Sequence, residues 1–145
     1  MTLNDIHKTS DNKLSGSIRI LLAVLFLMTG AMKLLIPMFA EAWSGQLLAA
    51  NIPLYEVSRW TVPFIEIALG AVLAVGTYVR PAVVVVMGIM VVATYVHLAV
   101  DDSSLFPLQP REPVIPFIVI LMSVYVLWRG AGAWSLDLRA TRAAV

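Results

Sequence analysis

The chain has 145 residues, of which 60% are apolar and 13% are charged, with a net charge of +1 and no cysteine. A soluble domain carries about 25% charged residues. This composition and a mean hydropathy of +0.88 therefore argue against a soluble domain and predict a polytopic protein of the lipid bilayer. The small net charge argues against nucleic acid as a partner. The lack of cysteine excludes thiolate catalysis, disulfide exchange and iron–sulfur ligation by this chain.

In chain order, a polar segment at 1–15 comes first, and we expect it to be a flexible cytoplasmic tail. Four apolar segments follow, each close to the 20 residues that cross about 30 Å of hydrocarbon as a helix. They lie at about 17–36, 60–79, 81–100 and 113–134. The sequence thus predicts an all-α fold, an antiparallel four-transmembrane-helix bundle over 16–138, with a second cytoplasmic tail at 139–145.

The connections differ in length. Only Arg80 and Pro81 separate the second and third apolar segments, which predicts a tight antiparallel hairpin. The connection 37–59 mixes apolar with polar residues, so we expect a short amphipathic helix at the membrane interface that ends near Pro53.

The four tryptophans fall near the expected interfaces and are interpreted as an aromatic belt. They are Trp43, Trp60, Trp128 and Trp134.

Basic residues predict the orientation, because cytoplasmic flanks of membrane helices are enriched in Lys and Arg. Seven of the ten basic residues lie on the side of the termini, and three, Lys33, Arg59 and Arg111, lie on the other. We therefore expect both termini in the cytoplasm and the chain in the cell membrane. On this side Arg19, Arg80 and Arg129 are expected to be surface anchors.

Three ionisable residues fall within the predicted spans, namely Lys33, Glu66 and His97. Because successive helices reverse direction, all three are expected in the outer half of the bilayer. A charged side chain at the centre of a membrane helix costs about 2.5–3.5 kcal/mol on insertion scales, so such residues usually face the bundle interior and pair. Glu66 is the deepest of the three, and Lys33 is its expected partner.

Helical spacing predicts which face of each helix points inward. In each predicted helix, one group of residues recurs at intervals of three and four and therefore shares one side. The groups are Arg19, Ala23, Phe26, Gly30 and Lys33; Glu66, Gly70, Leu73 and Thr77; Met90, Ala93 and His97; and Ile118, Met122, Tyr125 and Arg129.

Each ionisable residue also has a purely structural interpretation. Lys33 lies four residues before Pro37 and can extend to the headgroups. His97 lies near a helix end and can be an interfacial side chain. A Lys33–Glu66 pair can serve only to fix the register of two helices.

Several short motifs occur in order along the chain. They are R-x-L-L…F-L-M-T-G-A-M-K from Arg19 to Lys33, E-x-x-x-G from Glu66 to Gly70, G-x-x-x-R-P-A from Gly76 to Ala82, His97, and G-A-G-A-W-S-L-D from Gly130 to Asp137. In this order the chain resembles the DoxX family over about 14–138. The resemblance implies a four-helix bundle in the cytoplasmic membrane. It also implies a link to membrane redox work, since the family's namesakes are subunits of a thiosulfate:quinone oxidoreductase.

Three functions remain open. In the first, the chain is a redox-associated subunit with a quinone or small-substrate site, where Glu66 and His97 handle protons and Lys33, Tyr95 and Tyr125 bind the ligand. No intrinsic cofactor or metal is expected, so a peripheral or membrane redox partner protein supplies the electrons. The second is a non-catalytic membrane anchor or assembly subunit. The third is a small proton-coupled transporter, which a homo-oligomer would favour. Whether the chain is an enzyme stays open.

Overall fold

The structure is a computed structural model that describes residues 7–143. Within that range the chain is helical and has no strand. The elements are α2 (Lys13–Leu35), α3 (Pro37–Ala49), α4 (Tyr55–Val75), α5 (Val79–Ala99), the 3-10 turn η1 (Ser103–Leu105), α6 (Val114–Arg129) and α7 (Leu136–Ala143).

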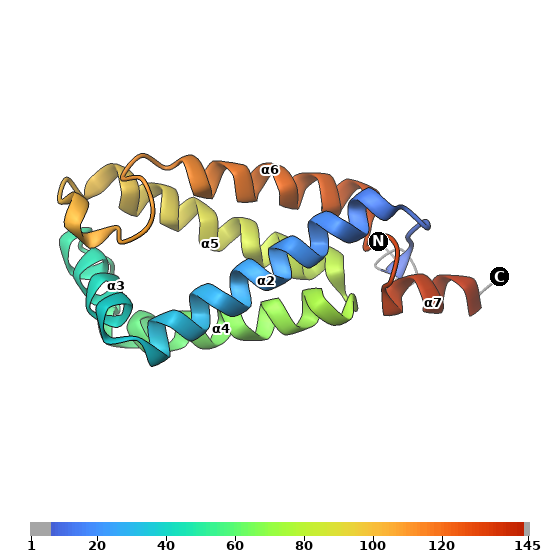
Figure 1. Ribbon diagram of the computed structural model, residues 1–145, viewed down its shortest axis with the longest axis horizontal. Coiled ribbons are helices and arrows are strands. Elements are labelled where there is room, and N and C mark those ends of the chain that lie inside the picture. The colour runs from blue at the N-terminus through green and yellow to red at the C-terminus, as the bar shows by residue number, and fades with distance from the viewer. Residues whose placement is uncertain (1–6, 144–145) are drawn as a thin grey trace.

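Four helices, α2, α4, α5 and α6, lie side by side along the long axis (Figure 1). At one end α3 and the loop around η1 cross the helix ends, and we call this the α3 end. At the other end are α7, the turn at 76–78 and the loop at 130–135, and we call this the α7 end. The N-terminal segment and the C-terminal helix meet there.

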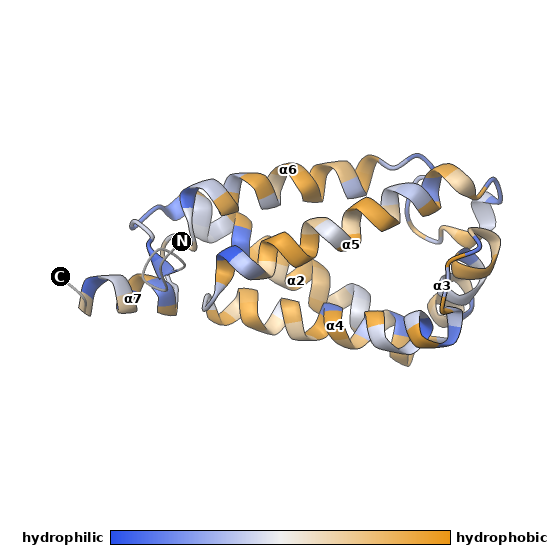
Figure 2. Cartoon of the chain, turned by 180° about the vertical axis from the view of Figure 1, so that it is seen from behind, coloured by the Kyte–Doolittle hydropathy of each residue, from blue (hydrophilic) through white to orange (hydrophobic). Residues whose placement is uncertain are grey.

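Three of these helices, α2, α4 and α5, are long and apolar enough to cross a membrane, and α6 is a shorter apolar helix. At 1.5 Å per residue, its 16 residues span about 24 Å, less than the roughly 30 Å of hydrocarbon. Large apolar side chains such as Leu21, Val91 and Leu121 are more than half exposed, and apolar residues colour the outer faces of the long helices (Figure 2). A surface of this kind requires lipid around it. The protein is therefore a membrane protein.

The first helix starts at Lys13, earlier than predicted, because its N-terminus is capped. The side chain of Asn12 accepts a hydrogen bond from the backbone N–H of Ser15 at 3.0 Å, which is the usual role of Asn at this position. The expected tail boundary at residue 15 thus falls inside α2.

The helices α4 and α5, which correspond to the second and third predicted spans, form the expected hairpin. The link between them is Gly76–Tyr78 rather than Arg80 and Pro81. Gly76 ends α4 with φ +73°, a left-handed conformation that glycine adopts without strain. Arg80 and Pro81 lie in the first turn of α5, where proline lacks only an N–H that has no helical partner.

Helix α6, which corresponds to the fourth predicted span, ends at Arg129, five residues before the predicted end at 134. Gly130 and Gly132 both have positive φ, +84° and +72°, and turn the chain back across the bundle end. The residues that follow form α7, so a helix occupies most of the segment expected to be the second tail.

Close packing of α2 on α4 defines the core. A Cβ atom added to Gly30 would lie 2.8 Å from the Pro63 carbonyl oxygen, and one added to Gly70 would lie 2.8 Å from the Leu27 nitrogen. Such contacts at small residues are typical of membrane helix pairs. The main core also contains Leu22, Phe26, Leu73, Val79, Val83, Val86, Val119 and Val126.

The predicted inward faces are confirmed for α2 and for the helical members on α4, where the ionisable residues and glycines are buried or half-buried. For α6 the prediction holds only in part, because Met122 and Tyr125 are half-buried. Ile118 and Arg129 are exposed, and the buried residues are Pro116, Val119, Ser123 and Val126. This helix is apolar nearly all round, so its sequence gives no polar stripe from which the core face could be read.

Candidate functional site

Lys33 and Glu66 form an ion pair between α2 and α4. Lys33 Nζ donates to Glu66 Oε1 at 2.5 Å, and the side chains are 20% and 4% exposed. Gly30, one turn before Lys33, allows this approach because its missing side chain leaves room for Glu66 Cβ. The predicted pair is therefore present, and it lies on the two helices that pack most closely.

The pair leaves one acceptor unused. Within residues 7–143, Glu66 Oε2 is buried and has no hydrogen-bond partner. A carboxylate has two oxygens and about four acceptor positions. Leaving a buried charged acceptor unpaired costs at least about 1–3 kcal/mol. Glu66 therefore has capacity for a proton or for a ligand's donor group.

Trp43 of α3 covers the ammonium group. Lys33 Nζ lies 4.5 Å from the centre of the indole ring, a distance at which the π-face attracts a cation. Trp43 is half-buried against the bundle, so it does not belong to an exposed aromatic belt. Trp60, Trp128 and Trp134 are at least 55% exposed, as an interfacial tryptophan should be.

A proline in α4 explains why Trp43 sits there. Pro63 has no N–H, so the carbonyl of Arg59, four residues earlier, lacks its helical donor. Trp43 Nε1 donates to that carbonyl at 3.2 Å. The indole N–H thus replaces the missing helical donor to the Arg59 carbonyl, while the face of the ring contacts Lys33.

A small pocket of about 60 Å³ opens beside the pair. Its lining comes from α2, α3 and α4 and combines two cations with two indoles. The residues are Lys33, Leu34, Ala40, Trp43, Arg59 and Trp60. Glu66 does not line the pocket. A ligand that enters would meet the ammonium group first, with the carboxylate behind it.

The other predicted site residues lie elsewhere. His97 Nδ1 is 2.6 Å from the carbonyl oxygen of Arg111, and its ring lies against Phe106 at 4.4 Å. The hydroxyl of Tyr95 donates to the Ala50 carbonyl at 3.2 Å. These two side chains tie α5 to the α3 end. Tyr125 is half-buried on α6. The structure thus brings together Lys33 and Glu66 and leaves His97 and Tyr95 bonded to other partners.

Arg19 is the buried charge whose environment sequence reasoning missed. It is fully buried, so the expectation of a surface anchor is wrong. Its guanidinium donates to the carbonyls of Leu73 and, at 2.9 Å, Ala74, the last turn of α4. It also donates to Ala131, Ala133 and Trp134 of the C-terminal loop at 3.0–3.2 Å. A planar fork with five N–H groups suits such a set of acceptors.

Asp137 completes the α7 end. Its carboxylate accepts hydrogen bonds from the backbone N–H groups of Tyr78 and Val79, both at 3.1 Å, and so caps the start of α5. The same carboxylate lies 2.5 Å from His7 Nδ1. Arg19 and Asp137 thus satisfy the two open helix ends of the α4–α5 hairpin.

The glycine-rich stretch from Gly130 was the available signal for this network. A loop that turns twice through glycine exposes carbonyls without helical donors. A buried arginine from another helix is a natural partner for them, although nothing in the spacing identifies which arginine.

Within the part of the chain that the structure describes, no three His, Cys, Asp or Glu side chains are placed to hold a metal ion. These features define a helical membrane protein with a buried Lys–Glu pair beside a pocket and a buried arginine at the opposite end that binds backbone carbonyls.

The comparisons with known proteins add the family. The model of the DoxX family matches residues 16–99, more than half of the chain, so the protein belongs to the DoxX family. The match includes Arg19, Lys33, Glu66 and His97. No curated protein and no solved structure matches the chain.

Proposed function

We propose that this DoxX-family protein is a membrane redox subunit that binds the carbonyl edge of a quinone at the Lys33–Glu66 pair. The observation that carries the proposal is the unpartnered Oε2 of Glu66, buried beside an ammonium group that faces a pocket. A group that offers both a carbonyl acceptor and, after reduction, a hydroxyl donor matches these two side chains.

The residues present fit one edge of such a ligand. Lys33 has three N–H donors, of which Glu66 uses one, so another is available to a carbonyl oxygen. The pocket of about 60 Å³ accepts a carbonyl edge rather than a whole ring. When bound, a quinone accepts two electrons and two protons to become a quinol, and in this proposal a redox partner protein delivers the electrons.

The chain's own residues would then orient the headgroup and handle its protons. Lys33 donates a hydrogen bond to the carbonyl oxygen and fixes its direction. Glu66 can hold a proton at Oε2, behind the ammonium group and shielded from water by α2 and α4. Trp43 holds Lys33 in place through its ring, and its indole N–H keeps it fixed to α4.

For the topology, we propose that α6 is a fourth span, so that both termini lie on one side of the cell membrane. Six basic residues at the α7 end besides the buried Arg19 support a cytoplasmic assignment for that side. They are Lys8, Lys13, Arg80, Arg129, Arg139 and Arg142.

Binding of a short-chain benzoquinone to the purified chain in nanodiscs tests the function. Quinones quench tryptophan fluorescence, and Trp43 and Trp60 line the pocket. We expect saturable quenching that is lost in Glu66→Gln and reduced in Trp43→Phe. Glu56→Gln is the matched control, because Glu56 is an exposed glutamate on the same helix. Equal saturable quenching in Glu66→Gln and wild type would contradict the proposal.

A second candidate is a non-catalytic assembly subunit, and the tight α2–α4 packing at Gly30 and Gly70 favours it. In that case the ion pair fixes the register of the two helices. Glu66→Gln would then lower the recovery of a partner complex, while quinone would give no saturable signal even with the wild-type chain.

A further inference from the structure

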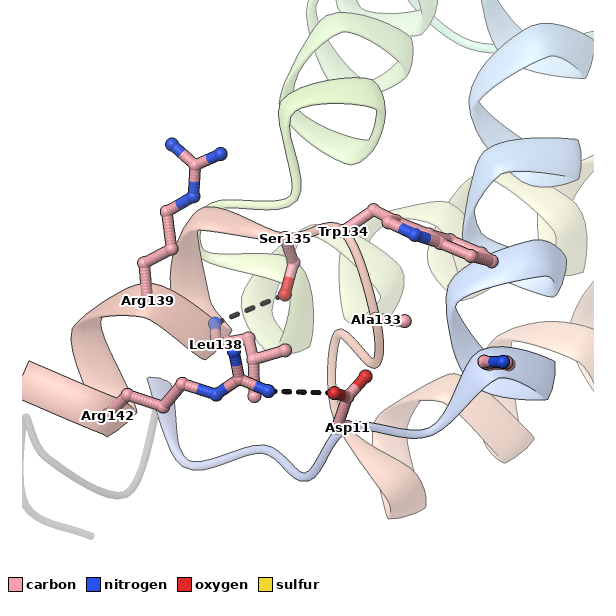
Figure 3. Close-up of a pocket in the computed structure, with 8 residues that line it drawn as sticks. Asp11, Ala133, Trp134, Ser135, Leu138, Arg139 and Arg142 are labelled. Atoms are coloured by element: carbon pink, nitrogen blue, oxygen red, sulfur yellow. Dashed lines mark hydrogen bonds and ion pairs between the residues drawn. The ribbon is translucent and has the colours of Figure 1, made fainter.

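A second, larger pocket lies at the α7 end (Figure 3), the opposite end of α2 from Lys33. Its volume is about 280 Å³, large compared with the roughly 30 Å³ share of one water molecule. The start of α2, the loop at 130–135 and α7 form its walls. The lining residues are Asp11, Lys13, Ala133, Trp134, Ser135, Leu138, Arg139 and Arg142.

The charges of this pocket are unbalanced. Three cations, Lys13, Arg139 and Arg142, line it together with a single acid, Asp11. Arg142 reaches across to Asp11 and pairs with it at 2.7 Å (Figure 3). Among the described residues, neither Lys13 nor Arg139 forms an ion pair. Two positive charges therefore remain for an anion.

The surroundings point to a lipid rather than to a soluble anion. Trp134 is 63% exposed, and its ring points from the 130–135 loop toward α2 (Figure 3). Leu14, next to Lys13, and Leu136, at the start of α7, are also exposed. Cations beside an exposed indole and exposed leucines, at the end of a membrane helix, match the boundary between headgroups and acyl chains.

We propose that this pocket binds the phosphate headgroup of an anionic phospholipid, which is attracted by the unpaired positive charges of Lys13 and Arg139 in the pocket wall. Arg142 stays paired with Asp11 and closes the side of the pocket formed by the N-terminal segment. The lipid thereby joins α2 to α7. This site is separate from the proposed quinone site and does not depend on it.

Native mass spectrometry of the full-length chain tests the proposal. The protein is exchanged in detergent against equal amounts of phosphatidylglycerol and phosphatidylcholine, and retained lipid is counted. We expect preferential retention of one phosphatidylglycerol. Each basic residue near an anionic lipid contributes about a fivefold gain in affinity, so Lys13→Gln or Arg139→Gln should weaken retention about fivefold and the double variant about thirtyfold.

Arg129→Gln is the control, because Arg129 is an exposed arginine at the same end that does not line the pocket. Retention unchanged by Arg129→Gln supports a specific site. Equal retention of the two lipids, or an equal loss in Arg129→Gln, would overturn it. Displacement of the lipid by millimolar glycerol 3-phosphate would overturn the lipid assignment and assign the pocket to a soluble phosphate ester.

Discussion

The two ends of this bundle bury charge in opposite ways. At the α7 end, Arg19 donates to five backbone carbonyls and Asp137 accepts from two backbone N–H groups. Toward the α3 end, Lys33 and Glu66 form one bond, and the second oxygen of Glu66 stays unpaired.

In the function proposed above, this difference separates a charge that only supports the fold from one that can also bind a ligand. A buried group whose donors are all used can only hold its neighbours together. A buried group with an unused acceptor next to a pocket can also bind or release something, and natural proteins keep few such atoms without a reason. Burial alone would have ranked Arg19 above Glu66 as a site, whereas hydrogen-bond capacity reverses that order.

The largest loss of stability is expected at the α7 end, where all five donors of Arg19 are used. Arg19→Met leaves five carbonyls without this donor, and three of these hydrogen bonds are buried. Each buried unpaired group costs about 1–3 kcal/mol, so the free energy of unfolding should fall by more than about 3 kcal/mol. Arg19→Lys should recover part of it, because an ammonium can reach fewer carbonyls. Unfolding by dodecyl sulfate in mixed micelles measures both. If Arg19→Met lost no more than Arg129→Met, an exposed-site control, Arg19 would have no structural role.

The next largest loss of stability is expected at the Lys33–Glu66 pair, and its size should depend on which partner is replaced. Lys33→Met leaves the Glu66 carboxylate buried alone and should cost about 3–5 kcal/mol. Glu66→Gln should cost less, because Lys33 keeps its contact with Trp43 and its partial exposure. The double variant should be more stable than Lys33→Met. Strictly additive losses in this double-mutant cycle would show that the two side chains do not interact.

A smaller effect is expected from the packing of the two helices that carry the pair. Gly70→Ala places a Cβ atom 2.8 Å from the Leu27 nitrogen, an overpacking that costs about 1–3 kcal/mol. Gly88→Ala is the matched control, because nothing lies within 4 Å of the added Cβ. The control should be neutral or stabilising. Thermal unfolding of the two variants side by side checks this, and equal melting temperatures would argue against close packing at Gly70.

The smallest effect concerns pH at the α3 end. Asp102 accepts hydrogen bonds from the hydroxyl and the backbone N–H of Ser104, and these bonds hold its pKa below the ordinary value. The turn η1 therefore gains stability above the unfolded-state pKa of Asp102 and loses it as the pH falls through the lower, folded-state pKa. Ser104→Ala should raise the pKa of Asp102 in a carboxyl-carbon NMR titration, whereas Ser103→Ala should leave it unchanged. An unchanged pKa in Ser104→Ala would contradict this assignment.

Sequence reasoning succeeded where one strong constraint acts. Apolar length predicted four spans, of which three are long enough to cross a membrane in the structure. The high energy of isolated charges in lipid predicted that Lys33 and Glu66 would pair. It failed where tertiary contacts decide. The sequence places Arg19 among the flanking cations, but in the structure it is buried and donates to carbonyls of the loop after Gly130. The sequence places Trp43 at the interface, but in the structure it is half-buried and donates to the Arg59 carbonyl, which Pro63 leaves without a helical donor. The core face of α6 could not be read because that helix has apolar residues on every side.

Lipid extraction with mass spectrometry of the gently purified protein tests most directly the proposal that a quinone binds at the Lys33–Glu66 pair. We expect quinone to copurify with the wild-type chain and with Glu56→Gln but to be lost from Glu66→Gln, while all three proteins insert and fold. Quinone absent from the wild type, or retained equally by Glu66→Gln, would contradict it. A stoichiometric partner protein in place of quinone would favour the assembly subunit.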